Sequence, residues 1–582
     1  MGEMSSTREW KLRSEIDEAS LQSLELETGF SPIALRVCLM RGLTHANAIR
    51  DYLNPRLENL TRPSAIKDMD LAVERLTRAR DAKQFIRIFG DYDVDGTTGA
   101  ALLSWMFRDS GFRFDASQPD RFKDGYGLNV GAVDAAHVQG VKVLITVDCG
   151  ISSFDAANRA KELGIDLIIV DHHQVDPVQG IPQAHAVINP QRSDCESALK
   201  QLCGCGLAFY LSMALRTQGR KNGWFQPGKE PNLKQHLDLV AMATAADMVP
   251  LVGDNHILIR HGMDVLRNSQ KPGVRALLQV AGVADKELSP SSLGFVIGPR
   301  INASGRMASA GLALELLTTT DEKRAFELAH QLEKLNQERA EVQNLIWDEV
   351  RVRVEQGIAD GKFKHGVVVA DANWHEGVVG IVASRVTETF KRPAIVIALR
   401  EDFGKGSARS WGGKDVLEAL RASSATLRGF GGHKYAAGVT VELDQVEAFT
   451  AAFNEALSHV VEDPSMRPLL IEGSCRFDEL DVKALSEIER LGPFGPGNPE
   501  PILTLRATVG GHRILKERHL KLNLVAISGK GLEAIWFGAA EKEEVLEQIS
   551  GSEESEWAGV PELNRFRGNV TPTLRVKDWR KL

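Results

Sequence analysis

The sequence predicts an α/β fold in which a parallel sheet is covered by helices on both faces. Apolar runs such as FIRIF (85–89), VKVLITV (141–147) and IDLIIV (165–170) have the length and composition of buried strands. Amphipathic stretches typical of helices follow the first two runs, at 98–107 and 152–164. Because strands and helices alternate in this way, we expect βαβ units and therefore a parallel sheet.

Length and composition are those of a globular protein with several domains. The chain has 582 residues, of which 43% are apolar and 25% charged, and domains usually have ~100–200 residues, so we expect about three or four. No run approaches the ~18 apolar residues of a membrane span, and the charged N-terminus has no apolar signal segment. A cytoplasmic location is therefore expected.

Charge and cysteine content exclude some functions. The net charge of −8 argues against a protein that coats nucleic acid, although it permits a local basic channel beside an acidic site. The six cysteines are scattered, so neither a disulfide scaffold nor a pair of zinc knuckles is indicated.

Beyond the first α/β domain, helical and strand-rich regions alternate. Residues 312–358 have apolar side chains at helical spacing and predict a helical connector, whose simplest role is that of a spacer. Strand-like runs resume at 366–372 and 393–399, and alternating stretches after about 465 predict a small β-barrel. The predicted parts are an N-terminal helical segment (1–60), the first domain (61–310), the connecting helix (311–358), a second α/β domain (359–460) and the barrel (461–582).

Three aspartates at alternate positions, Asp91, Asp93 and Asp95, follow the first predicted strand and precede a glycine. An EF-hand calcium loop also begins D-x-D-x-D-G, but its twelfth position is a glutamate, and here that position is Leu102. A helix precedes an EF-hand loop, whereas a strand-like run precedes these aspartates. The cluster therefore needs an explanation other than calcium.

Further acidic and imidazole groups follow other apolar runs, namely Asp148, Asp171 with His172 and His173, and Asp247. The carboxyl ends of parallel strands meet at one edge of a sheet, where such folds bind ligands, so we expect these groups to converge. A single aspartate after a strand usually caps a helix or forms a turn. That role does not account for so many acidic groups in succession at the ends of apolar runs.

The predicted cluster favours two divalent cations. Carboxylates a few Å apart repel each other unless cations neutralise them. Carboxylate with imidazole and without thiolate suits Mn²⁺ or Mg²⁺ better than structural zinc. Two such ions can activate water and stabilise the entering and leaving oxygens of a phosphoester, so the expected chemistry is phosphoester hydrolysis.

At this point the sequence resembles the DHH phosphoesterase superfamily and, more narrowly, the RecJ single-strand exonucleases. The matching elements span about 85 to 501 and occur in family order: GDYDVDGTT, PDRFKDGYGLN, TVDCGIS, IVDHHQ, LCGCGLAF, AADMVPL, GPRINASGRM, WHEGVVGIVASR, GSARS, GGHKYAAG and LGPFGPGNPEP. The resemblance implies a DHH domain joined by a long helix to a substrate-binding DHHA1 domain, followed by an OB-fold-like barrel.

The resemblance also implies roles for the acidic and imidazole residues. It makes Asp93, Asp95, Asp148, His172 and Asp247 the ligands of two metal ions, with Asp148 as the bridge. Asp91 would belong to the same acidic motif, and His173 would face the scissile phosphate. Relatives that act on small substrates carry a metal-binding histidine where this chain has Phe89, which leaves the first metal with fewer protein ligands.

The predicted substrate-binding residues come from several motifs. Family-like segments place Arg121, Arg306 and Gln337 at the 5′ end of the substrate, whereas Arg300 and Asn302 would shape a loop. In the second domain Ser407, Arg409, Gly431, Gly432 and His433 are predicted to offer hydroxyl, guanidinium and backbone N–H groups to phosphates, although such glycines serve turns equally well. In the barrel, residues 506–530 contain six Lys or Arg against one Glu, which suits a phosphate backbone or an ordinary solvated face.

The resemblance implies a metal-dependent 5′→3′ exonuclease that degrades single-stranded DNA to mononucleotides in recombination, DNA repair and mismatch repair. The expected cofactors are two Mn²⁺ or Mg²⁺ ions, and the expected partners are single-stranded DNA, a single-strand-binding protein and a RecQ-like helicase. One alternative is a phosphodiesterase of short oligonucleotides or cyclic dinucleotides, whose chains lack the basic C-terminal barrel. The other is a non-catalytic nucleic-acid-binding protein, which would show gaps in the acidic set.

Overall fold

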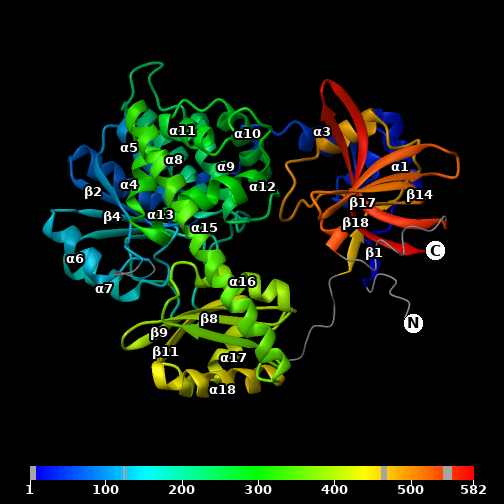
Figure 1. The fold of residues 1–582 in the computed structure, drawn as a ribbon. Coiled ribbons are helices and arrows are strands. Elements are labelled where there is room, and N and C mark those ends of the chain that lie inside the picture. The colour runs from blue at the N-terminus through cyan, green and yellow to red at the C-terminus, as the bar shows by residue number, and fades with distance from the viewer. Residues whose placement is uncertain (1–7, 122–124, 126, 460–467, 542–552) are drawn as a thin grey trace. The chain divides into compact units, whose positions relative to one another are not determined.

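The computed structural model describes residues 8–121, 125, 127–459, 468–541 and 553–582 (Figure 1). The chain divides into two compact units. The first is drawn from residues 62–247 and 262–466, and the second from residues 1–61, 248–261 and 467–582. The first unit therefore contains most of both predicted α/β domains, and the second joins the two ends of the chain with residues 248–261.

The first sheet is wholly parallel, as the alternating pattern predicts. Its strand order is β3 (Arg113–Ser117), β2 (Phe85–Gly90), β4 (Val143–Val147), β5 (Asp166–Val170) and β6 (Ala186–Ile188). Every residue of β4 is buried, since helices cover both faces of the sheet. The helices of this α/β part are α4 (Met69–Asp81), α5 (Val94–Asp109), α6 (Val130–Val138) and α7 (Phe154–Glu162).

A helical layer follows the sheet in sequence. It consists of α8 (Gly204–Lys221), α9 (Leu237–Ala246), α10 (Asp254–Arg267), α11 (Pro272–Val280), α12 (Pro290–Ser292), a π-helical turn (Leu293–Ile297), α13 (Gly298–Met307) and α14 (Gly311–Thr318). Helix α5, which follows β2, packs against both α8 and α9.

Helix α15 (Glu322–Ala359) is 38 residues long and links the two α/β domains (Figure 1). The second domain has a five-stranded sheet in the order β10 (Gly429–His433), β11 (Ala436–Glu442), β9 (Phe403–Arg409), β8 (Ala394–Leu399) and β7 (Val367–Asp371). Its helices are α16 (Val379–Phe390), α17 (Val416–Ala422) and α18 (Val446–Ser458). The end of α15 contributes Trp347 and Val350 to the core of this domain.

The second unit is built around a strongly bent sheet. Its strands are β13 (Gly473–Ser474), β14 (Leu503–Leu515), β15 (His519–Val525), β16 (Gly531–Trp536), β18 (Asn569–Lys581) and β17 (Ser555–Phe566). Because β14 also pairs with β17, the sheet closes into a barrel, as the alternating sequence predicts.

The N-terminal segment packs into this barrel unit. Its helices are α1 (Glu18–Thr28), α2 (Pro32–Met40) and α3 (Ala46–Leu53), and they are accompanied by α19 (Val482–Glu489). Strand β1 (Trp10–Leu12) pairs in parallel with β12 (Leu469–Ile471), and Trp10 Nε1 donates to Asp578 Oδ2 (2.7 Å). Among the described helices none is long and apolar enough to cross a bilayer.

Candidate metal and phosphate site

Three aspartates stand side by side where neighbouring strands end. Asp91, Asp148 and Asp171 directly follow β2, β4 and β5, and each continues the hydrogen-bond ladder by one residue. Their backbone N–H groups donate to Val147 O (3.1 Å), Val170 O (2.9 Å) and Ile188 O (3.1 Å), respectively. The parallel register therefore brings these carboxylates to the same sheet edge, as the sequence predicts.

Asp93 and Asp95 lie at the start of α5. Asp93 caps the helix, since its side chain accepts from the N–H groups of Asp95 (3.0 Å) and Gly96 (3.2 Å). Asp95 is buried and accepts from Gly204 N (2.6 Å) and Cys205 N (2.7 Å) at the start of α8. A Cβ atom at Gly96 would lie 2.4 Å from Asp91 N, so the tight path of the chain requires a glycine after the third aspartate.

His172 lies at the centre of the acidic residues. Its Nε2 is 3.1 Å from Asp148 Oδ1, 3.6 Å from Asp95 Oδ2 and 3.6 Å from Asp247 Oδ2. Asp247 comes from the C-terminal end of α9 rather than from a strand end. Its side chain reaches the same cluster nevertheless.

These side chains form three overlapping groups with the spacing of metal ligands. The groups are Asp91 with Asp93 and Asp148, Asp95 with His172 and Asp247, and Asp148 with His172 and His173, each with ligand atoms within 4.8 Å of one another. Asp148 and His172 each belong to two groups. All five residues that the sequence suggests as metal ligands are therefore brought together, and Asp91 joins them.

The carboxylates have raised pKa values because too little positive charge lies near them. Burial, and then the neighbouring aspartates, raise the pKa values of Asp91 and Asp148 well above the ordinary value, and the same causes raise the pKa of Asp247 to about 8. Asp91 Oδ1 is also buried and has no hydrogen-bond partner among the described residues. Two divalent cations would neutralise these charges, so the donor set fits Mn²⁺ or Mg²⁺.

Asp171 belongs to none of the three groups of potential metal ligands, and instead it holds the two histidines in place. It accepts from the backbone N–H groups of Ile151 (2.9 Å), His172 (2.7 Å) and His173 (3.1 Å), and its Oδ1 lies 2.8 Å from His173 Nδ1. Burial lowers the pKa of His173, but the hydrogen bond and charge of Asp171 outweigh it and raise that pKa to about 9. Asp171 is absent from the residues predicted as catalytic, although the DHH motif contains it.

Arginines of the first unit gather beside the acidic groups. The Arg121 guanidinium lies over the ring of Tyr92, 5.1 Å from its centre. Tyr92 itself stands between Asp91 and Asp93 in the sequence. Arg306 on α13 donates from Nη1 to Gly377 O (3.0 Å), and Arg409 donates to Ser407 Oγ (2.8 Å). Burial, and then the charge of Arg121, lower the pKa of Arg306 to about 10.

His433 is influenced by charges from both the arginines and the acidic site. Burial lowers its pKa, and so do the nearby charges of Arg409 and His173. His433 ends β10, a strand that also carries Gly431 and Gly432 and is exposed along its length. Arg121, Arg306, Arg409 and His433 are thus near enough for their charges to act on one another, and Ser407 contacts Arg409.

The structure also places three further residues that the sequence singles out. Gln337 is exposed on α15 and donates to Glu333 Oε1 (3.0 Å) of its own helix, and no described contact joins it to the arginines. Arg300 lies within α13 rather than in a loop, where it pairs with the same Glu333 (2.5 Å) and donates to Val296 O. Phe89 is 4% exposed and belongs to the hydrophobic core, so its position offers nothing to a metal.

The basic stretch of the barrel forms an exposed face on β14 and β15. A hollow of about 290 Å³ is lined there by residues that include His512, Arg513, Lys521 and Asn523. Phe537, just after β16, is 56% exposed and packs its ring edge-on against His519. This face has the side chains that a single nucleic-acid strand requires, although Lys521 also pairs with Glu533.

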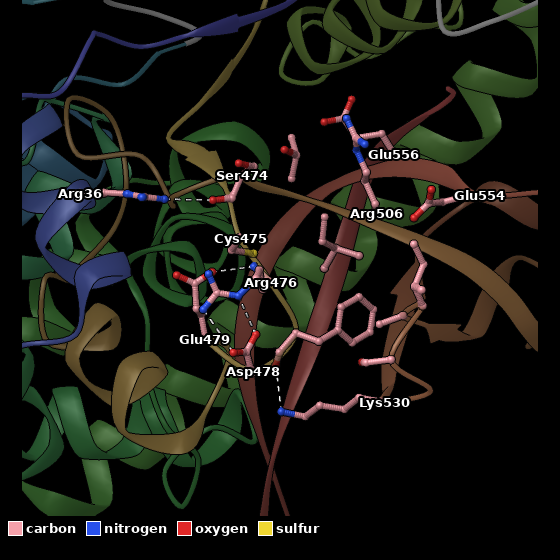
Figure 2. Close-up of a pocket in the computed structure, with 16 residues that line it drawn as sticks. Arg36, Ser474, Cys475, Arg476, Asp478, Glu479, Arg506, Lys530, Glu554 and Glu556 are labelled. Atoms are coloured by element: carbon pink, nitrogen blue, oxygen red, sulfur yellow. Dashed lines mark hydrogen bonds and ion pairs between the residues drawn. The ribbon is translucent and has the colours of Figure 1, made fainter. Parts of the chain in front are cut away.

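A larger pocket of about 980 Å³ lies elsewhere in the second unit (Figure 2). Three of its four basic groups bond to neighbouring groups: Arg476 pairs with Asp478 (3.1 Å), Arg36 donates to Ser474 O (3.2 Å) and Lys530 donates to Phe477 O (2.9 Å). Acidic side chains, among them Glu479 and Glu554, share the lining. The pocket is therefore not a continuous basic surface for phosphates.

Comparisons with known proteins agree with this geometry. Family models match at residues 85–244 (DHH family, N-terminal domain), 363–459 (DHHA1 domain) and 471–578 (RecJ OB domain). The chain is 36% identical over 572 residues to the single-stranded-DNA-specific exonuclease RecJ of Escherichia coli, covering 96% of each chain.

Solved structures are similar over nearly the whole chain. RecJ of Thermus thermophilus in complex with Mn²⁺ has a TM-score of 0.82 at 28% identity, covering 99% of this chain and 80% of that one. The complex of the same protein with Mg²⁺ has a TM-score of 0.77 at 27% identity and covers 99% and 78%. These similarities confirm the predicted fold class of a DHH domain, a DHHA1 domain and an OB-type barrel.

Proposed function

The chain belongs to the RecJ family of single-stranded-DNA-specific exonucleases, and from this premise we propose how its residues degrade a DNA strand. It is a single-stranded-DNA-specific exonuclease that uses Mn²⁺ or Mg²⁺. Our proposal adds that it acts from the 5′ end and releases mononucleotides in recombination, DNA repair and mismatch repair.

We propose that Asp91, Asp93, Asp95, Asp148, His172 and Asp247 hold two metal ions, with Asp148 between them. When bound, such ions activate water and stabilise the entering and leaving oxygens of a phosphodiester. Asp171 fixes the ring of His173 through its contact with Nδ1, so that His173 presents its other ring nitrogen to the scissile phosphate. An N–H at that nitrogen would donate a hydrogen bond to the phosphate and stabilise charge that develops there.

We propose that the arginines form a cationic end of the active site. Arg121, Arg306 and Arg409, with Ser407 and His433, would bind the terminal phosphate of the strand. The backbone N–H groups of Gly431 and Gly432 belong to the same proposed phosphate site. A strand that must place its end in this pocket is cut only near that end, which explains exonuclease rather than endonuclease action.

Each part of the chain has its own proposed role. We propose that residues 61–310 carry the chemistry, that residues 359–460 bind the substrate end, and that the basic face of the barrel in residues 461–582 holds the strand. Such an enzyme needs free single-stranded ends, so a RecQ-like helicase and a single-strand-binding protein are its proposed partners. Chromosomal DNA as substrate implies action in the cytoplasm.

The observation that carries this proposal is the convergence of six metal-ligating groups beside a cluster of arginines. The test is hydrolysis of single-stranded DNA labelled at the 5′ or the 3′ end, with Mn²⁺, Mg²⁺ or EDTA. We expect labelled mononucleotides to appear first from the 5′ label, only with metal, and not with the Asp148→Ala variant. Asp155→Ala, an exposed aspartate on α7, is the matched control and should keep full activity.

Other outcomes of this test would contradict the proposal. Release first from the 3′ label would reverse the proposed polarity. Cleavage of dinucleotides or cyclic dinucleotides while long strands survive would make the enzyme a small-substrate phosphodiesterase. Tight binding of DNA without cleavage in any metal would indicate a non-catalytic protein.

A further inference from the structure

A π-helical turn lies against the end of helix α9, where one of the metal-site aspartates is found. The turn (Leu293–Ile297) runs without a break into α13. A Cβ atom at Gly294 would lie 3.3 Å from Ala245 O, so the backbone of the π-helical turn contacts the last turn of α9. Asp247 follows α9 directly. The π-helical turn therefore borders the metal site, as such turns often do at functional sites.

Helix α13 continues along the acidic loop between β2 and α5. Two of its glycines pack against this loop and its first helical residue. A Cβ atom at Gly298 would lie 3.7 Å from Val94 Cγ2, and one at Gly305 would lie 3.2 Å from Tyr92 O. Val94 and Tyr92 flank Asp93, a proposed metal ligand. Since the two glycines are seven residues apart, one face of α13 follows the acidic loop for two helical turns.

The neighbouring face of this helical segment carries an aromatic ring, an amide and a guanidinium. Phe295, Asn302 and Arg306 follow one another at intervals of seven and four residues, so they lie on one face. Arg306 belongs to the proposed pocket for the strand end, and Phe295 lies roughly 16 Å from it at ~1.5 Å per residue. Stacked nucleotides are ~3.4 Å apart, so this face is long enough for more than one nucleotide. The acidic loop runs beside it, between its two ends.

Two side chains on this face lack partners. Phe295 is 75% exposed, more than any other Phe, Tyr or Trp in the described part of the chain, and no described aromatic or cationic side chain packs against its ring. Asn302 Oδ1 is buried and has no hydrogen-bond partner among the described residues. A single exposed apolar side chain is ordinary, but an exposed ring and an unmet acceptor on one face beside a metal site indicate a ligand. A nucleobase offers both a π face and N–H donors, whereas a phosphodiester offers neither.

We propose that Phe295 is a substrate-binding residue that stacks on a base of the DNA strand, at the second or third nucleotide from the 5′ end. The stacked base lies beyond the scissile phosphate, so this contact holds the remaining strand while the terminal nucleotide is released. Because every base has a π face, the contact does not depend on sequence. This inference rests on the proposed function, because it assumes that the 5′ end lies at Arg306.

The test compares kcat/KM for an intact single-stranded 20-mer with kcat/KM for strands in which one of the first five nucleotides from the 5′ end lacks its base. For the unmodified enzyme, loss of the second or third base should lower kcat/KM at least about fivefold, the lower end of what one stacked base contributes. Phe295→Ala should cause a similar fall on the intact strand and no further fall when that base is missing, because both changes remove the same contact. Phe295→Trp, which keeps an aromatic ring, should retain the response to the missing base.

Phe326→Ala is the matched control, because Phe326 is another exposed phenylalanine of the same unit and packs against His330 of its own helix. Its kcat/KM values should equal those of the unmodified enzyme, and thermal unfolding should show that all variants are folded. Unchanged activity of Phe295→Ala on the intact strand, or a response to each missing base equal to that of the unmodified enzyme, would overturn the role of Phe295. An unmodified enzyme that degrades no strand would instead contradict the proposed function itself.

Discussion

At the scale of single residues, the site is a set of buried carboxyl groups whose pKa values are raised in the absence of metal ions. Burial and mutual repulsion raise the pKa of Asp247 to about 8 and those of Asp91 and Asp148 well above the ordinary range. In the unfolded chain the same groups ionise near pH 4. The metal-free protein therefore binds more protons when folded, and these groups favour folding only at low pH.

Metal affinity and metal-free stability should consequently change with pH in opposite directions. Between pH 6.5 and 8.5 we expect the affinity for Mn²⁺ to rise, because fewer protons must leave the carboxylates when the ion binds. Over the same range the unfolding temperature in EDTA should fall. Calorimetric titration in buffers of different ionisation enthalpy measures the released protons, and an affinity that does not depend on pH would contradict these pKa values.

Residue roles were predictable where a simple rule places the side chain. The rule that ligands lie at the carboxyl ends of parallel strands placed Asp91 and Asp148 correctly at one edge. The sequence suggests Gln337 as a substrate contact, yet that side chain is exposed and bonded within α15. Arg339, two residues later, is half-buried. The sequence motif alone did not distinguish which of these two polar residues of α15 is turned inward.

At the scale of elements, close contacts between helix starts and strand ends fix the site. Asp148 has a left-handed backbone (φ 61°), which is strained for a residue other than glycine. The start of α8 lies directly against it: a Cβ at Gly204 would be 2.7 Å from Asp148 Cβ and 2.9 Å from its Cα. Gly204 also donates its N–H to Asp95. One glycine thereby sets the distance between two proposed metal ligands.

Substituting each of the two glycines in the first turn of α8 should separate this effect from helix stability. Gly204→Ala forces Asp148 or α8 to move, and we expect a loss of at least about tenfold in kcat with weaker Mn²⁺ binding, as for groups that orient ligands. Gly206→Ala meets only Leu202 and Cys203 at 3.4 Å or more. It should keep activity and gain up to about 1 kcal/mol of stability from helix propensity. Equal activity of both variants would show that the contact with Asp148 does not matter.

The elements themselves follow from the sequence to different degrees. The strands β2, β4 and β5 are continuous apolar runs, because a parallel sheet is buried on both faces. Asp247 also follows an apolar run, but that run forms helix α9. The sequence did not show this, because a fully buried helix and a buried strand look alike over ten residues. The arrival of Asp247 at the site depends on the packing of α9 against α5, which sequence periodicity does not contain.

At the scale of the whole molecule, the two ends of the chain make one unit. Ile33 and Ala34 of α2 belong to the same buried cluster as Leu505, Trp557 and Leu574 of the barrel. Arg41 donates to Asn498 Oδ1 (2.7 Å), and Asn498 in turn donates to Leu491 O and Pro493 O. The sequence indicated a helical N-terminal segment but not its partner, because pairing between segments so far apart in the chain leaves no local signal.

Replacing a buried isoleucine and an exposed leucine by alanine tests whether the two chain ends share one core. Ile33 is 1% exposed within the barrel cluster, so Ile33→Ala should destabilise the second unit by about 2–5 kcal/mol. Leu26, on α1, is 90% exposed, and Leu26→Ala should change stability by less than about 0.5 kcal/mol. Scanning calorimetry resolves the two units if they unfold separately. An Ile33→Ala protein with unchanged transitions would contradict the shared core.

The most direct test of the account is to locate the metal ions themselves. Crystals of the protein soaked with Mn²⁺ and measured at the manganese absorption edge should give two anomalous peaks about 3.5–4 Å apart. Asp148 should lie between them, with Asp91 and Asp93 on one side and Asp95, His172 and Asp247 on the other. A single peak, or peaks away from these residues, would contradict the claim that the strand-end acids form a two-metal active site.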